Sequence, residues 1–183
     1  MKRYVWLVPL LVFGIHPLLG ATLEQLTMND LIGKSTAIVR GTVADSWAAL
    51  TGSIIYTHYK VQVSESFKGP QQSSVEIVVP GGVVNNRSQS FSGSPTLNKG
   101  DDLVLFLWTS RAGLTQIMGL TQGLFAIAPG GAADPMATRS ASHELMLDPK
   151  TAQPVKDAAL SMHLSDLRSL IANTLQASPG VSQ

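Results

Sequence analysis

Alternation of apolar and polar positions in the middle of the chain predicts β-strands. In 54–64 the odd-numbered positions from Ile55 to Val63 face a core, and the even-numbered positions from Tyr56 to Gln62 face solvent. Residues 75–79 alternate in the same way. The run 103–108 is apolar without interruption, which is typical of a strand covered on both faces. Further strands are predicted at 36–45, 115–120 and 123–127.

These strands predict a mainly β fold, a small OB-like antiparallel barrel over residues 22–128. Three glycines stand within or beside the predicted strands, at Gly41, Gly119 and Gly123. A small barrel needs tight bends or bulges, and glycine is the residue that permits them. The barrel is therefore expected to bend at these positions.

Helical signals flank the barrel on both sides. Thr22 and Gln25 have the spacing of a capping box, and the apolar stripe that follows predicts a short N-terminal helix over 22–33. Residues 129–153 show no period and are expected to form an irregular linker. Pro154 then stands near the start of a predicted C-terminal helix over 154–177.

The first 21 residues have the layout of a secretory signal peptide. Met1-Lys2-Arg3 is basic, Tyr4–Leu19 carries no charge, and Gly20-Ala21 offers small residues for cleavage. The alternative is an N-terminal membrane anchor. Pro9 and His16-Pro17 shorten the unbroken apolar run to well below the roughly 20 residues of a spanning helix. The sequence thus predicts export, with no transmembrane segment after cleavage.

Composition limits the compartments and the classes of partner that fit this protein. The 183 residues include no Cys, which excludes disulfides, Cys-bound zinc and thiol nucleophiles. Export without Cys is typical of a bacterial protein of the periplasm or the extracellular medium. The formal charge is +1, and it becomes −1 (11 basic against 12 acidic residues) once Lys2 and Arg3 leave with the leader. A nucleic-acid partner is therefore not expected.

Candidate catalytic residues are few. His143 and Asp148 can be combined with a Ser into a hydrolytic triad, but no Gly-x-Ser-x-Gly elbow is present. His143, Glu144 and Asp148 are the one compact set of possible metal ligands, and their spacing matches no standard zinc site. Adjacent Asp101 and Asp102 point to opposite faces of a strand. We therefore expect a protein that is not an enzyme and uses no metal or cofactor.

The best candidate for recognition is the polar segment 83–98. It carries Asn85, Arg87 and Phe91, and Arg and aromatic residues are enriched in interface hot spots. Tyr56 and His58, on the outward face of their strand, are the second part of the predicted partner-binding surface. The alternative is that this segment has only a structural role and that the Phe91 side chain packs against the rest of the protein.

Several short motifs occur in a familiar order. They are Ala37–Val43, Tyr56-Thr57, Val61-x-Val63, Ser66-Phe67-Lys68-Gly69 and the apolar Leu103–Leu107. This order resembles the netrin-like module, which includes the N-terminal domain of the tissue inhibitors of metalloproteinases and has an OB-like five-stranded barrel. The inhibitors chelate the protease zinc through a disulfide-anchored N-terminal Cys. This chain has no Cys, so the resemblance does not imply that mechanism.

A second resemblance is to short exported bacterial proteins of unknown function. The shared string is Ile55-Tyr56-Thr57, Lys68-Gly69, Pro80-Gly81-Gly82 and Gly100-Asp101. Together these observations predict an exported, non-enzymatic binding module whose partner is another exported or envelope protein. Two alternatives stay open: an envelope hydrolase that uses His143 in the 136–153 segment, and a structural component of an envelope assembly. The partner's identity and the oligomeric state are not predicted.

Overall fold

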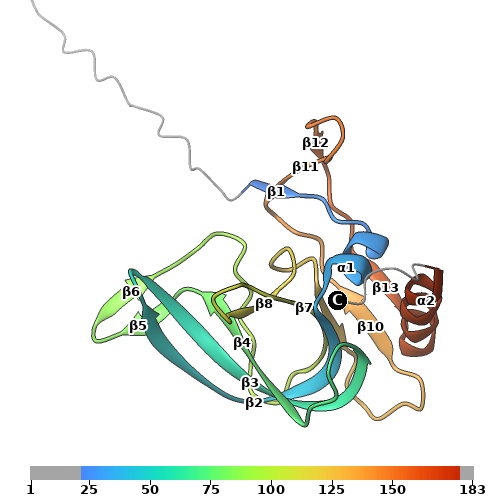
Figure 1. Ribbon diagram of the computed structural model, residues 1–183, viewed down its shortest axis with the longest axis horizontal. Coiled ribbons are helices and arrows are strands. Elements are labelled where there is room, and N and C mark those ends of the chain that lie inside the picture. The colour runs from blue at the N-terminus through green and yellow to red at the C-terminus, as the bar shows by residue number, and fades with distance from the viewer. Residues whose placement is uncertain (1–21, 178–183) are drawn as a thin grey trace, which may run out of the picture.

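The computed structural model describes residues 22–177, so the predicted signal peptide (1–21) lies outside the described residues. The chain is mainly β with two helices, as expected (Figure 1). Its elements are β1 (Thr22–Glu24), α1 (Met28–Lys34), β2 (Ala37–Thr51), β3 (Ile54–Lys68), β4 (Ser74–Pro80), β5 (Gly82–Val84), β6 (Arg87–Gln89), β7 (Asp102–Thr109), β8 (Thr115–Ile117), β9 (Leu124–Ile127), β10 (Met136–Arg139), β11 (Leu145–Leu147), β12 (Pro154–Val155), β13 (Leu160–His163) and α2 (Leu164–Ala177). Neither described helix is long and apolar enough to cross a membrane.

One large antiparallel sheet organises the fold. Its strands run in the order β13-β10-β9-β7-β2-β3-β4, and β8 pairs with β7. The sheet curls until β4 lies alongside β8. Among the described residues no strand pairing joins β4 to β8, so the sheet is not a closed barrel. The mainly β expectation is confirmed, whereas the closed OB-like barrel is not.

The long β2–β3 hairpin bends where a glycine permits it. The pairing of β2 with β3 shifts register between Arg40 and Gly41 and again between Val43 and Asp45. A Cβ at Gly41 would clash with the carbonyl oxygen of Gln62, so only glycine allows the two backbones to come this close. The bend that the sequence predicts at Gly41 is confirmed.

The sheet buries apolar side chains on both faces, and β7 contributes to both. Leu103, Leu105 and Leu107 enter the core inside the curled sheet. Val104 and Phe106 face a second core, which α1 and α2 cover from outside. The uninterrupted apolar run of β7 follows from this double burial, as the sequence predicts.

The N-terminal helix is shorter than predicted and begins at a different cap. The Thr22 end is strand β1, which pairs in parallel with β11. The capping box is formed by Thr27 and Asp30, whose side chains each accept from the other's backbone N–H. Buried Gln122 holds the intervening chain, since its side chain accepts from the backbone N–H of Leu26 and donates to the Glu24 carbonyl. The helix predicted over 22–33 is therefore wrong in its first turn and a half.

Replacing Thr27 with alanine is expected to lower the free energy of unfolding by about 1 kcal/mol, because the cap of α1 is lost. Thr22→Ala, at the position of the predicted cap, should change it by less than about 0.5 kcal/mol. Urea unfolding measures both values. Equal losses in the two variants would contradict the assigned cap.

The same cap sets an acid dependence. The hydrogen bond from the Thr27 hydroxyl holds the pKa of Asp30 below its ordinary value. A carboxylate with a lowered folded-state pKa stabilises the protein above its unfolded pKa, and that contribution is lost as the pH falls through the folded value. The gap between wild type and Thr27→Ala should therefore shrink below about pH 4.

The C-terminal third contains more strand than predicted. The expected linker 129–153 holds β10, which pairs with β9 and β13 in the large sheet, and also β11. The predicted helix over 154–177 begins only at Leu164, because β12 and β13 occupy its first part. Asp134 fixes this start from a distant loop: its carboxylate accepts from the backbone N–H and the hydroxyl of Ser165. That hydrogen bonding keeps the pKa of Asp134 below its ordinary value.

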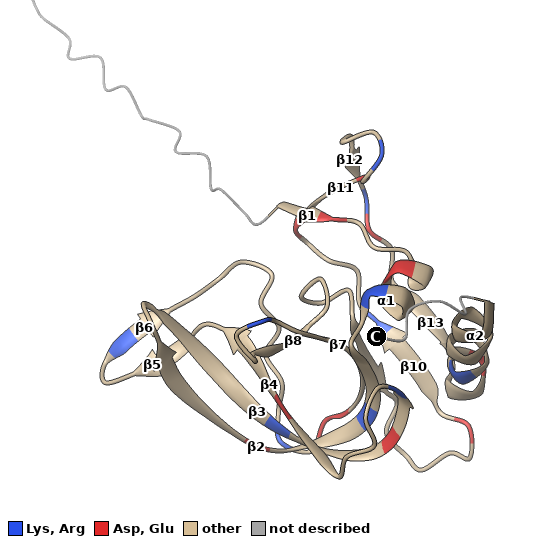
Figure 2. Cartoon of the chain, viewed as in Figure 1, with Lys and Arg blue, Asp and Glu red and all other residues tan. Residues whose placement is uncertain are grey.

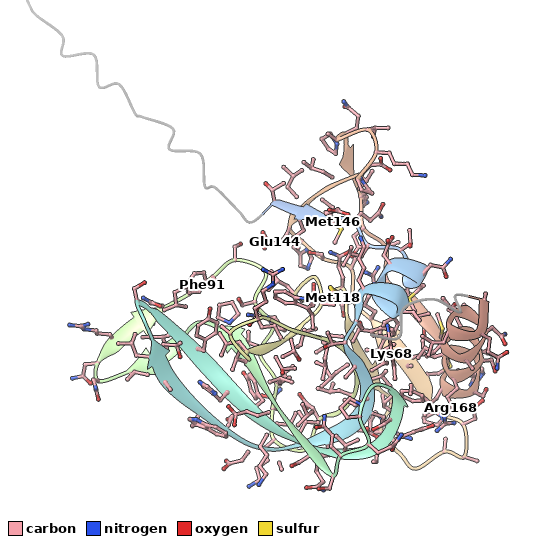
Figure 3. The ribbon with its side chains drawn as sticks, viewed as in Figure 1. Lys68, Phe91, Met118, Glu144, Met146 and Arg168 are labelled. Carbon is pink, nitrogen blue, oxygen red and sulfur yellow. The ribbon has the colours of Figure 1, made fainter. Side chains whose placement is uncertain are left out.

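Two basic side chains attach the helices to β3 (Figure 3). The Lys68 ammonium donates to the carbonyls of Ile32 and Gly33 at the end of α1, at 2.8 and 2.9 Å. Arg168 on α2 makes two hydrogen bonds to the Glu65 carboxylate, at 2.9 and 2.8 Å. Burial lowers the pKa of Lys68. The C-terminal helix thus packs on the sheet, which the sequence left open.

Candidate functional site

The predicted recognition segment begins as a β-hairpin. Strands β5 and β6 pair from Gly82–Gln89 to Val84–Arg87. The two residues between them, Asn85 and Asn86, have φ of +49° and +59°, as a type I′ turn requires. Val83 on β5 is 64% exposed, and Arg87 is also exposed. The hairpin therefore presents an apolar side chain on one face and a cationic side chain on the other, beside a tight turn.

Three hydrogen bonds made by side chains fix the hairpin to the start of β3. The Gln89 side chain accepts from the backbone N–H of Ile55 at 2.7 Å and donates to the Ser53 carbonyl at 2.9 Å. The Thr57 hydroxyl donates to the Gly81 carbonyl at 2.8 Å. A side chain that bridges two strands in this way holds a short hairpin in one orientation.

The hairpin lies on the inner side of the β2–β3 ribbon. A Cβ at Gly82 (φ +139°) would meet the Thr57 hydroxyl and the side chains of Ala48 and Ile55, all of which point inward. Tyr56 and His58 alternate with Ile55 and Thr57 and so face outward. The structure therefore places the two parts of the predicted surface on opposite faces of the ribbon.

Phe91 follows β6 and is 40% exposed, so it is not tucked into the core (Figure 3). The chain just beyond it is tied to the β11 region, because the Ser92 hydroxyl donates to the Glu144 carboxylate at 2.9 Å. Glycine is required at 93, where φ is +78° and a Cβ would contact the Glu144 side chain. Phe91 is thus an exposed aromatic on a segment that is held at both ends.

A groove of about 420 Å³ lies beneath this segment. Its walls come from the end of β4, from Thr57 and Tyr59 on β3, and from residues 89–91 and 94–97, which include Phe91. The Tyr59 hydroxyl accepts a hydrogen bond from the backbone N–H of Leu97. This volume lies within the range of known ligand pockets.

The outward face of the ribbon carries its own aromatic cluster. The rings of Trp47 and His58 stack with centroids 5.3 Å apart, and His58 Nδ1 lies 2.8 Å from the Glu76 carboxylate. Trp47 is 42% exposed. Sequence reasoning missed Trp47 because it ended this strand at 45. Continuing the alternation from Val43 would have turned Trp47 inward, and the register shift between Val43 and Asp45 is what turns it outward.

The candidate catalytic residues take part in local contacts. His143 is exposed, Glu144 accepts from Ser92, and Asp148 accepts from the backbone N–H groups of Lys150 and Thr151. The hydrogen bonds from Thr151 and Lys150 lower the pKa of Asp148. Across residues 22–177 no three His, Asp or Glu side chains gather as a metal site.

A second groove, of about 500 Å³, lies between the Gly100–Leu103 stretch and residues 126–132. Its lining includes three charged residues, Arg40, Asp101 and Asp102. Arg40 and Asp102 form a paired hydrogen bond at 3.1 and 2.6 Å, so the guanidinium is already occupied. Asp101 instead accepts from the backbone N–H of Asn98, which separates the roles of the two adjacent carboxylates.

Charge is scattered over the molecule. Basic and acidic segments alternate along the ribbon and form no single patch in this view, although β6 carries a basic residue (Figure 2). The chain matches no protein-family model, no curated protein and no solved structure. The exposed residues and grooves of the molecule are therefore the evidence for its function.

Proposed function

We propose that the chain is an exported, non-enzymatic binding module with an OB-like, netrin-like build, and that it recognises another exported or envelope protein. The surface formed by Asn85, Arg87 and Phe91, here called the hairpin face, makes the contact. The observation that carries the proposal is the fixed hairpin, which holds an exposed cationic and an exposed aromatic side chain next to a groove.

Rigidity is what makes this surface suited to recognition. Ordering a flexible loop on binding costs free energy, and a loop fixed beforehand avoids that cost. The Gln89 bridge and the Ser92–Glu144 hydrogen bond fix the hairpin face in the free protein. Arg and aromatic residues surrounded by polar groups are the usual centres of binding energy.

The netrin-like part of the proposal is limited to architecture. It is supported by the order of strands, the bend at Gly41 and the Lys68-Gly69 turn. The known inhibitors depend on an N-terminal Cys, and this chain has none. A metalloprotease is therefore one possible partner among exported proteins, and the inhibitors' zinc chelation does not apply.

The test begins with the chain carrying a C-terminal tag and produced in its own host. Proteins captured from the envelope and medium fractions are identified, purified and titrated against the tagged chain by calorimetry. Arg87→Ala and Phe91→Ala are each expected to weaken binding about 5- to 30-fold, as typical hot-spot losses of 1–2 kcal/mol do. Lys60→Ala, exposed on the outward face, is the matched control and should leave the affinity unchanged.

Two results would overturn the proposal. One is a purified partner that binds the Arg87→Ala and Phe91→Ala variants as tightly as wild type. The other is a loss of binding confined to Tyr56→Phe and His58→Ala, which would place the interface on the outward face.

A further inference from the structure

The groove beneath Phe91 has a lining without charge. It is built by hydroxyl, amide, glycine, proline and apolar residues, and no Asp, Glu, Lys, Arg or His belongs to it in the described part of the chain. The 500 Å³ groove, by contrast, contains Arg40, Asp101 and Asp102. Burying a charge without a partner costs far more than burying a neutral polar group. The smaller groove is therefore suited to an uncharged occupant.

Polar groups in this groove still have hydrogen-bonding capacity. The Tyr59 hydroxyl accepts from Leu97, and within residues 22–177 its own proton has no acceptor. The Ser94 hydroxyl is buried, and it has no partner in the described part of the chain. Thr57 and Gln89, in contrast, are already engaged in fixing the hairpin. An unsatisfied buried hydroxyl costs free energy unless an occupant supplies its partner.

Part of the backbone along the groove is also unpaired. Between β6 and Leu97 no strand ladder forms, and within the described part of the chain the N–H groups of Ser90, Ser92 and Thr96 have no protein acceptor. Ser90 and Thr96 are themselves part of the groove wall. An extended peptide supplies main-chain acceptors at the spacing that such a segment offers, as in strand-addition complexes. This favours a peptide over a compact small molecule.

We propose that the groove holds an extended, uncharged segment of the protein partner, with proline, hydroxyl or small apolar side chains. The segment packs against Phe91 and hydrogen-bonds to residues 90–96. This inference rests on the proposed function, since the same partner would contact the hairpin face.

The test uses a phage-displayed library of random eight-residue peptides, selected on the full chain. Selected peptides should share a core of four positions that lacks Asp, Glu, Lys and Arg. Synthetic copies with one core residue changed to Asp or to Lys should bind about tenfold more weakly or worse, because the charge is buried without a partner.

A charge placed in the wall provides the matched test. Ser90→Asp, at an exposed position of the groove wall, should abolish binding of the neutral peptides and restore binding of the copies with Lys in the core. Ser88→Asp, two residues earlier and outside the groove, should change neither. Unchanged thermal unfolding of both variants confirms that they are folded.

Three outcomes would overturn the inference: selected peptides with charged cores, no selected peptide whose binding Ser90→Asp alters, and binding of neutral oligosaccharides that the selected peptides do not displace. The proposed function is judged separately. A captured partner that is lost with Arg87→Ala but unaffected by Ser90→Asp would retain the binding module and reject the peptide groove.

Discussion

Asp157→Ala is expected to lower the free energy of unfolding by about 3–5 kcal/mol, because it leaves a buried arginine without its counter-ion. Arg139 on β10 donates to the Asp157 carboxylate at 2.7 Å, and the two side chains are only 6% and 3% exposed. Arg139 also donates to the Ala158 carbonyl, while Asp157 accepts from the backbone N–H of Ser142. The pair thus joins β10 to the chain on either side of β11 and β12. Urea unfolding followed by circular dichroism measures the loss.

A double variant tests whether the loss of stability comes from the missing ion pair or from the arginine charge that is left buried without a partner. Replacing both residues with apolar ones of similar size, as in Arg139→Met with Asp157→Leu, removes the charge that would be stranded. Such double replacements are often neutral or stabilising, so this variant should be more stable than Asp157→Ala. A loss below about 1 kcal/mol in Asp157→Ala would contradict the buried pair.

The sequence predicted those strands whose pattern is fixed by their own burial. The alternation at 54–64 matches β3, where Ile55, Tyr59 and Val61 are buried. The continuous apolar run matches β7, which is covered on both faces. In these cases each residue's polarity follows from the face it occupies, so local pattern is enough.

Elements that depend on distant partners were not predicted. Strand β1 exists because Thr22–Glu24 pairs with Leu145–Leu147, more than a hundred residues away. The start of α2 depends on Asp134, 31 positions before Ser165. A local capping signature at Thr22 competed with the true one at Thr27, and tertiary pairing decided between them.

Only part of the proposed recognition surface could be predicted from the sequence. Exposure of Arg87 and Phe91 follows from the polar composition around them, and both are exposed in the structure. Hydrogen bonds of the Gln89 and Thr57 side chains decide on which side of the ribbon the hairpin lies. The periodicity of the sequence does not predict such contacts. Tyr56 and His58 were correctly placed outward, yet for this reason they do not join the hairpin face.

Phe106→Ala is the second large effect, an expected loss of about 3–5 kcal/mol from a cavity in the helix-covered core. Phe106 on β7 is fully buried, and its ring centroid lies 5.8 Å from that of Phe125. Leu164 and Leu167 of α2 belong to the same core, so the cavity also weakens the packing of that helix on the sheet. Urea unfolding gives the total loss, and hydrogen exchange in α2 reports whether the helix loosens first.

Trp108→Ala is the matched control for that cavity. Trp108 lies on the same strand and alternates onto the same face, but it is 44% exposed. Although more atoms are removed, its replacement should cost much less than Phe106→Ala, because surface substitutions rarely exceed about 0.5 kcal/mol. If the two losses were equal, the outer face of β7 would not be divided into a covered and an uncovered part. If Phe106→Ala left exchange in α2 unchanged, the helix would be held mainly by its other contacts, such as the Arg168–Glu65 hydrogen bonds.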